Sequence, residues 1–337
     1  MIWLHRYTKL VAASTVLLIA AGGMVTSTGS GLSVPDWPNT YGWFMFSFPV
    51  NKWVGGILYE HSHRLIASTV GFLTIILAVW TWRVDSRPWV RTLGFAALGA
   101  VILQGLLGGI TVLLKLPPAV SIGHAGLAQL FFCITLSLAV FTSPSWLAGD
   151  RRGSAADAPP RADRPLRLLA TATTLMVYAQ ILLGATMRHT NAGMAIPTFP
   201  LAFGHLLPPV WTSAIAIHFA HRVGALFVTI AILATAVYVR THHSSRRELV
   251  RPAMLLVGLV AAQILLGAFV VWSALQPIVN TIHVVNGALV LGTSLVLTLR
   301  TYRPLAMDSR VSADGVPHGG RLSSARTRGT AAKESHA

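Results

Sequence analysis

The chain has 337 residues, of which 53% are hydrophobic and only 11% are charged, and its mean hydropathy is +0.62. Soluble domains carry about 25% charged residues, so this composition excludes an ordinary soluble enzyme and a disordered chain and indicates a membrane protein. The net charge of +16 would suggest nucleic-acid binding in a soluble protein. In a multi-span protein basic residues collect on the cytoplasmic side, so no nucleic-acid partner is expected. The single cysteine, Cys133, excludes an internal disulfide and a cysteine-ligated metal site.

Eight apolar stretches are long enough to cross a bilayer, which takes about 20 helical residues. In chain order they cover residues 10–28, 57–82, 92–114, 119–141, 168–187, 210–239, 249–272 and 278–299. The first stretch has a basic start and small residues near its end, as a secretory signal has. It also has a counterpart later in the chain, so we expect it to be a structural helix. The sequence thus predicts an all-α membrane protein with eight transmembrane helices.

The basic residues are distributed unevenly between the connecting loops. Of the 26 lysines and arginines, 21 lie on the side that holds both termini. Three lie on the other side (Lys52, Lys115 and Arg188), and Arg64 and Arg222 lie within spans. Because cytoplasmic loops are enriched in lysine and arginine, both termini are predicted to be cytoplasmic.

The two halves of the chain share matches that keep their order. Residues 22–26 and 31–38 are echoed 162 positions later by residues 184–188 and 193–200. His63-Arg64 matches His221-Arg222 at an offset of 158, and residues 104–108 with His124 match residues 263–267 with His283 at an offset of 159. An even number of spans in each half gives the halves the same orientation. The repeat therefore predicts two pseudo-symmetric parallel four-helix bundles.

These patterns divide the chain into four parts. We expect a first bundle in residues 1–142, a flexible linker rich in Pro, Ala, Asp and Arg in residues 143–166, and a second bundle in residues 167–303. Residues 304–337 are Ser-, Gly- and Arg-rich with few apolar side chains, which predicts a disordered cytoplasmic tail.

Ionisable residues within spans are costly and indicate function. Four of them, His63, His124, His221 and His283, lie on spans that run from outside to inside, each within about three turns of the outer end. The spacing predicts that His63 faces His124 in the first bundle and that His221 faces His283 in the second. The two pairs are therefore expected at one depth.

Zinc, copper and heme iron are the candidates for a pair of imidazoles on opposing helices. Zinc requires a further ligand, which only Glu60 or His218 could supply, and copper stays open. A heme iron between two axial histidines fits best, because it needs no other protein donor. Arg64 and Arg222, which follow the first histidine of each pair, are expected to bind the heme propionates.

Glu60 breaks the repeat, because the matching position in the second half is His218. Two interpretations stay open: Glu60 handles protons or stabilises positive charge at one site only, or it is an interfacial carboxylate paired with Arg64 or Lys52. His61 is expected to face solvent, and His218 to orient a propionate or lie at the interface. The aromatic- and proline-rich outer loop, residues 27–53, is predicted to form a lid or interfacial helix.

The combination of Glu60-His61-Ser62-His63-Arg64, the loop from Gly29 to Pro38, His124, His221-Arg222 and His283 resembles the heme A synthase family, over roughly residues 8 to 300. The resemblance implies two four-helix bundles in the bacterial cell membrane, with the heme sites toward the periplasmic side. It also implies oxidation of the C8 methyl group of heme O to a formyl group, through successive hydroxylations and loss of water from a geminal diol.

Residue roles also follow from the resemblance alone. His221 and His283 would ligate a resident heme b, His63 and His124 would flank the substrate heme, and Glu60 would be the acid that the oxidation needs. Heme O synthase and cytochrome oxidase assembly proteins would be partners, and a homo-oligomer is compatible with the pattern. Many bacterial members carry a cysteine pair in the first outer loop; this chain has none there, which puts a thiol route through that loop in doubt.

Two other functions can be weighed against this one. A di-heme b-type electron carrier would stack its hemes near opposite membrane faces, whereas the four histidines are expected near one face. A transporter built on a parallel repeat would need broken helices or polar residues at the midplane, and the polar residues of this chain lie at the outer side.

Overall fold

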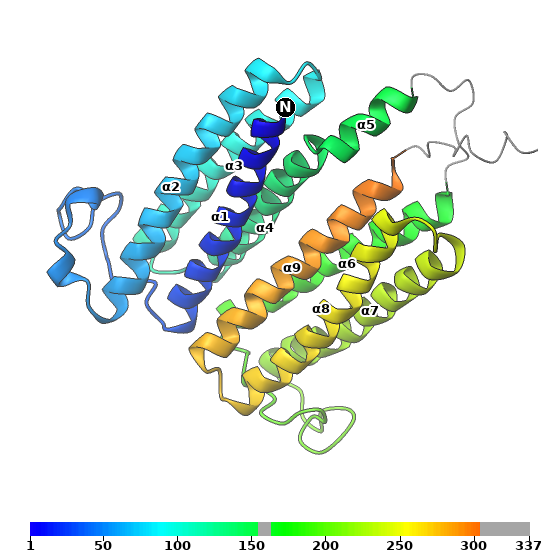
Figure 1. Ribbon diagram of the computed structural model, residues 1–337. Helices are drawn as coiled ribbons and strands as arrows, with labels where there is room; N and C mark the ends of the chain where they lie inside the picture. The colour runs from blue at the N-terminus through cyan, green and yellow to red at the C-terminus, as the bar shows by residue number, and fades with distance from the viewer. Residues whose placement is uncertain (154–162, 304–337) are drawn as a thin grey trace, which may run out of the picture.

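The computed structural model describes residues 1–153 and 163–303, and the regular structure in these ranges is helical (Figure 1). The elements in chain order are α1 (Ile2–Ser27), η1 (Met45–Ser47), η2 (Val50–Lys52), α2 (Gly55–Val84), α3 (Pro88–Leu113), α4 (Pro118–Phe141), α5 (Pro144–Gly153), α6 (Arg164–His189), α7 (Ser213–His242), α8 (Arg247–Trp272) and α9 (Pro277–Thr301).

Eight helices in the described part of the chain are long and apolar enough to cross a membrane, and they are α1–α4 and α6–α9. Large apolar side chains on their outer faces are exposed, among them Phe72 and Leu175. Such side chains are stable where lipid covers them. The eight predicted spans are confirmed, and the protein is a multi-pass membrane protein.

Local sequence signals explain where several helices begin. Proline is the first residue of α3, α4 and α9, where its missing N–H would have no intrahelical partner. Thr212 caps α7, whose observed start at Ser213 is three residues later than predicted. Helix α1 begins at Ile2, earlier than the predicted residue 10, because the helix continues through the polar residues before the apolar stretch.

The prediction of a flexible linker from residue 143 is wrong for its first part. The chain turns at Ser143, whose Oγ accepts a hydrogen bond from the Trp146 N–H at 3.3 Å, and continues as helix α5. The Trp146 ring packs edge-on against Phe141, with centroids 4.9 Å apart. The predicted end of the linker is also wrong, because Asp163 caps α6 and residues 164–166 belong to that helix. Residues 154–162 of the linker and the predicted disordered tail, residues 304–337, lie outside the described residues.

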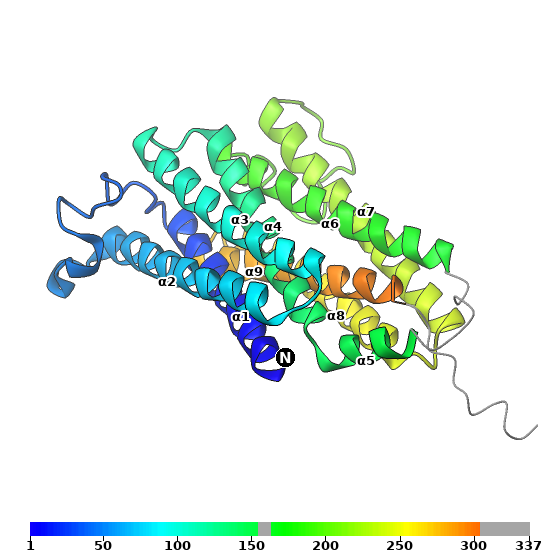
Figure 2. The same cartoon turned by 90° about the horizontal axis from the view of Figure 1, so that it is seen from above.

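The spanning helices form two groups, α1–α4 and α6–α9 (Figure 1). Helices α1–α4 pack together, as do α6–α9, and α1 and α4 face α6 and α9 where the groups meet (Figure 2). A buried cluster of Ile19, Phe132 and Ala288 joins α1, α4 and α9 across this boundary. Gly292 of α9 lies against the Phe132 ring of α4, so a side chain there would push the helices apart.

Polar contacts also link the two groups. The Arg188 guanidinium at the end of α6 donates hydrogen bonds to the Gly23 carbonyl oxygen of α1 at 2.9 Å and to Ser27 Oγ at 2.6 Å. Ser27 Oγ in turn lies 3.2 Å from Thr281 Oγ1 of α9. The loop-side end of α1 is therefore held by two helices of the other group.

Asp163 fixes the start of α6. Its Oδ1 accepts a hydrogen bond from the Leu166 N–H at 2.9 Å, and its Oδ2 lies 2.6 Å from His243 Nε2. Burial raises the pKa of Asp163, but the Leu166 N–H and the contacts with His243 and Tyr238 outweigh burial and hold the pKa below its usual value. A carboxylate whose pKa is lower in the folded state stabilises that state above the unfolded pKa and loses this effect as the pH falls through the folded pKa.

We predict that Asp163→Ala destabilises the protein by about 1 kcal/mol at pH 7, as expected for loss of an N-cap. Below about pH 4, where the carboxylate protonates, the difference from wild type should shrink. Thermal unfolding of purified protein at both pH values measures this. Thr212→Ala removes a neutral N-cap, whose Oγ1 accepts from the Ile215 N–H at 3.2 Å, so its effect should not depend on pH. An equally pH-independent effect of Asp163→Ala would contradict the assignment.

Candidate functional site

The four predicted histidines lie at similar depths from one end of the bundle. His63 and His221 each follow the first residue of their helices, α2 and α7, by eight residues. His124 and His283 follow the first residues of α4 and α9 by six. At a rise of 1.5 Å per residue these positions are about 9 to 12 Å from the helix starts. All four helices start at the end that carries the two long loops (Figure 1).

Each histidine ring lies against a glycine of the preceding spanning helix. A Cβ added at Gly22 would be 3.0 Å from Cε1 of His63, and one added at Gly184 would be 2.9 Å from Cε1 of His221. At Gly108 and Gly267 the corresponding distance, to His124 and His283, is 3.3 Å. A methyl group there would force the ring to move. The four glycines thus create the space in which the imidazoles lie.

The structure brings the histidines together in the predicted pairs. His63 and His124 are close enough to interact electrostatically, and so are His221 and His283. Nδ1 of His63, His124 and His283 is buried and has no hydrogen-bond partner among the described residues. Buried polar atoms are normally paired, so each of these rings keeps a nitrogen that no described group occupies.

Glutamines that the sequence analysis gave no role hold the histidine helices. Gln104 Nε2 donates to the His124 carbonyl oxygen at 2.9 Å, and Gln263 Nε2 donates to that of His283 at 3.1 Å. Both glutamines belong to the sequence repeat, and their recurrence is the sequence signal that could have identified them as site residues.

Gln180 distinguishes the second half from the first. Its amide nitrogen lies 3.0 Å from His221 Nδ1 and donates to the His221 carbonyl oxygen at 2.7 Å. The amide lies against Gly224, where any side chain would collide with it. At the matching positions the first half has Leu18 and Ile66, neither of which can hydrogen-bond an imidazole. Only the second half therefore fixes its first histidine ring through a side-chain amide.

Glu60 and Arg64 form a clamp on the first outer loop. Glu60 is 3% exposed; its Oε2 accepts from the Val34 N–H at 2.8 Å and its Oε1 accepts from Arg64 at 2.7 Å. Arg64 also donates to the carbonyl oxygens of Val34, Asp36 and Asn39, at 2.7 to 2.9 Å. The ion pair between Glu60 and Arg64 agrees with the interpretation of Glu60 as a carboxylate paired with Arg64. Together with these carbonyl oxygens, Glu60 occupies both terminal nitrogens of Arg64.

The second half uses different groups for the same contacts. The Ile196 N–H donates to Nδ1 of His218 at 3.3 Å. In the first half, the corresponding hydrogen bond runs from the Val34 N–H to Glu60. Arg222 donates to the Ile196 carbonyl oxygen at 2.9 Å. Its other terminal nitrogen, Nη1, is buried and has no partner among the described residues. Arg222 therefore retains a donor for an anion, whereas the terminal donors of Arg64 are already used.

The first outer loop folds across the end of the bundle. The Trp37 ring lies directly against Gly109 of α3, next to the glycine that accommodates His124. Asp36 Oδ1 and Oδ2 accept from the N–H groups of Tyr41 and Gly42, each at 2.8 Å. Burial raises the pKa of Asp36, but these N–H groups and the Arg64 charge outweigh it and hold the pKa below its usual value. The loop is therefore a folded structure over α2 and α3.

The expectation that His61 faces solvent is wrong. The side chain is completely buried, its Nδ1 lies 3.1 Å from Thr40 Oγ1, and the ring packs against Trp53 at a centroid distance of 4.7 Å. The prediction considered only the position of His61 on its own helix, α2. In the structure the first outer loop covers that face of α2.

His189 is a further residue that the sequence analysis left without a role. It is the last residue of α6 and is close enough to His124 to interact electrostatically. A residue of the second half is thus within electrostatic range of one histidine of the first pair. Only the packing of α6 on α4 reveals this, and no spacing in the sequence signals it.

The arrangement limits which metal the site could hold. Among the described residues, no group of three or more His, Cys, Asp or Glu side chains gathers around one point. A zinc site normally uses at least three protein ligands, so the residues do not fit zinc. Paired imidazoles with unpartnered buried nitrogens in an apolar bundle fit the two axial positions of a heme iron.

The fold and the site define a multi-span helical membrane protein with two histidine pairs suited to heme. The family model described as cytochrome oxidase assembly protein, COX15-CtaA, matches residues 5–295, and the chain belongs to this family. It is 30% identical to a heme A synthase of Shouchella clausii over 80% of this chain and 86% of that protein. It is 31% identical to one of Symbiobacterium thermophilum, over 81% of this chain and 88% of that protein.

We predict that Arg64→Ala releases the first outer loop, because four charge-assisted hydrogen bonds are lost. Chymotrypsin cleavage at the loop aromatics, which include Tyr41 and Trp43, should become at least about tenfold faster. The rate is measured by mass spectrometry of the digest. Arg222→Ala, the matched change in the other half, should leave cleavage of this loop unchanged. Equal rates for wild type and Arg64→Ala would contradict the clamp.

Proposed function

We propose that the protein is a heme A synthase, which oxidises the C8 methyl group of heme O to a formyl group by successive hydroxylations for cytochrome oxidase biogenesis. The observation that carries the proposal is the repeated histidine pair with a carboxylate, Glu60, beside only one of the two pairs. Family membership supports the same activity.

We assign a resident heme b to His221 and His283 and the substrate heme O to His63 and His124. The Gln180 contact supports this division, because a ring held by a second partner suits a ligand that stays bound. His63 has no such partner among the described residues, and a less restrained ring suits a substrate that enters and leaves. The resident heme would supply one-electron redox chemistry when bound.

The chain's own side chains would position both hemes. Arg222 directs an unpaired, buried Nη1 to the region where an anionic propionate would be stabilised. Arg64 would act on the substrate heme mainly through the outer loop that it holds. Trp37, which packs on Gly109, would help to exclude water from the substrate side.

Glu60 would handle the proton released during oxidation or stabilise positive charge as it develops. It lies one turn before His63 on the same helical face, and its carboxylate is buried. The ion pair with Arg64 would hold the Glu60 carboxylate in place. His218 at the matching position cannot supply a carboxylate, which supports the assignment of chemistry to the first half.

The proposed topology follows the charge distribution. The two bundles, residues 1–142 and 167–303, would be pseudo-symmetric, with both termini cytoplasmic and the heme sites near the periplasmic side of the cell membrane. Repeated contacts support the pseudo-symmetry: the bridge between Thr40 and Trp43 recurs between Ala202 and His205, 162 residues later. Heme O synthase and cytochrome oxidase assembly proteins would be partners.

A di-heme electron carrier fits the site less well. The four histidines lie six to eight residues from the starts of helices that begin at the same end. A carrier that moves electrons across a bilayer needs sites near both faces. The decisive experiment is extraction and chromatographic identification of hemes from cells that express this chain with a heme O producer. Appearance of heme A supports the synthase, and unchanged heme O contradicts it.

We predict that His221→Ala removes the low-spin heme b absorption from purified protein, because an axial ligand is lost. His63→Ala is the matched control and should keep that absorption. Gln180→Leu, which copies the first half, should weaken heme b retention about 10- to 100-fold, as is typical for a contact that orients a metal ligand. Loss of the absorption in His63→Ala but not in His221→Ala would reverse the assignment of the halves.

We predict that Glu60→Gln lowers heme A formation about 10²- to 10⁴-fold, the usual effect of losing a proton-handling group. Heme b absorption should stay normal, and heme O should accumulate in the cells. The amide oxygen can still accept from Val34, so chymotrypsin cleavage of the loop should remain slower than in Arg64→Ala. Normal heme A yield would exclude a catalytic part for Glu60.

A further inference from the structure

A cleft of about 720 Å³ lies at the end of the bundle opposite the histidine pairs, between the two groups of helices. It opens where α1 and α8 begin and where α4 and α9 end. Its lining comes from both groups of helices and from the start of α5. Its volume is in the range of small-molecule sites.

The cleft is strongly basic. The cationic residues that line it are Lys9, Arg247, Arg251, Arg300 and Arg303. Glu248 is the one carboxylate among its described lining residues, and it is paired with Arg246 at 2.8 Å. The lining therefore carries a large excess of positive charge that its own acidic group does not balance.

Several of these cations have unfavourable surroundings, although Arg300 also interacts with Glu248. Arg303 Nε is buried and has no hydrogen-bond partner among the described residues. Arg300 and Arg303 are close enough to repel each other. Arg247 and Arg251 lie in the first turns of α8, where the positive end of the helix dipole disfavours a cation. An anion bound in the cleft would relieve all three unfavourable interactions.

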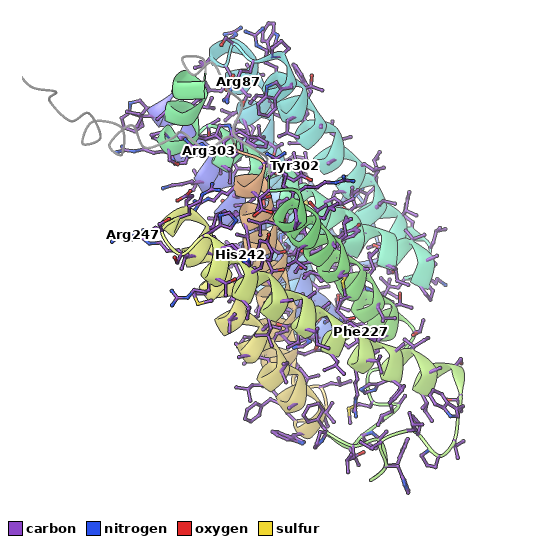
Figure 3. The ribbon with its side chains drawn as sticks, turned by 90° about the vertical axis from the view of Figure 1, so that its right-hand side faces the viewer. Arg87, Phe227, His242, Arg247, Tyr302 and Arg303 are labelled. Carbon is purple, nitrogen blue, oxygen red and sulfur yellow. The ribbon has the colours of Figure 1, made fainter. Side chains whose placement is uncertain are left out.

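Part of the lining is apolar, with Leu136, Ala139, Val140 and Val296 from α4 and α9. Trp146 also lines the cleft, and tryptophan is enriched at membrane interfaces. Figure 3 shows Arg247 and Arg303 at this same end of the spanning helices. The cleft thus combines apolar and cationic side chains at the boundary of the apolar spans.

We propose that this cleft binds the phosphodiester headgroup of an anionic phospholipid, with an acyl chain against the apolar walls. Free phosphate shares the charge but has no apolar part, so the combined lining favours the lipid. Basic pockets between transmembrane helices are suited to acidic headgroups. The proposal uses none of the heme-site residues and does not depend on the proposed heme A synthase activity.

The test uses the full chain, purified in detergent. In separate samples the protein receives dioleoyl phosphatidylglycerol, dioleoyl phosphatidylcholine or, without lipid, inorganic phosphate. Native mass spectrometry measures bound lipid, and thermal unfolding measures stabilisation. Arg251→Gln/Arg303→Gln should bind phosphatidylglycerol about thirtyfold more weakly, because each interfacial cation contributes about fivefold. Arg83→Gln/Arg240→Gln removes two exposed arginines at the same end but outside the cleft and should bind normally.

The proposal is supported if phosphatidylglycerol stabilises the protein and the other two additives do not. This stabilisation should be lost in the cleft variant and kept in the control variant. Equal stabilisation by phosphatidylcholine overturns it, as does equal stabilisation by inorganic phosphate, which would assign a small anion instead. The single variant Arg251→Gln changes an exposed side chain and should still weaken binding about fivefold. Unchanged lipid binding in both cleft variants also overturns the proposal. None of these results alters the expected heme A yield.

Discussion

The contact on which the rest of the structure depends is that of an imidazole ring with a glycine on the preceding spanning helix. It occurs four times, at Gly22, Gly108, Gly184 and Gly267. Helices in a bilayer gain little from the hydrophobic effect between them, so small residues that permit close packing decide how they associate. Here the close approach also positions a histidine. Because a backbone limits each ring on one side, the histidine pairs can be preorganised without any bound group.

The same pair of histidines is surrounded by different polar groups in the two halves. In the second half Gln180 contacts the ring of His221 and Arg222 keeps a free buried donor. In the first half Leu18 replaces the amide and Glu60 replaces His218, and the donors of Arg64 hold the outer loop. A few polar substitutions on a repeated backbone therefore give the two histidine pairs different surroundings.

The two halves are also joined where the first site is built. Arg188 of α6 donates to the carbonyl oxygen of Gly23, the residue after the glycine that accommodates His63. His189, the next residue, is close enough to His124 to interact electrostatically. The second half thus contacts α1, the helix whose Gly22 limits the His63 ring, which gives a physical reason for keeping the halves together.

The sequence alone determined the eight spans, the repeat and the four histidines, because span length, hydropathy and spacing are local properties of a helix in a bilayer. It could not determine that α5 continues beyond α4, that His61 is buried under the outer loop, or that Arg64 bonds loop carbonyl oxygens. These features depend on contacts between segments far apart in the chain. Helical periodicity assigns a residue to a face of its own helix, and only the packing of the other segments decides what covers that face.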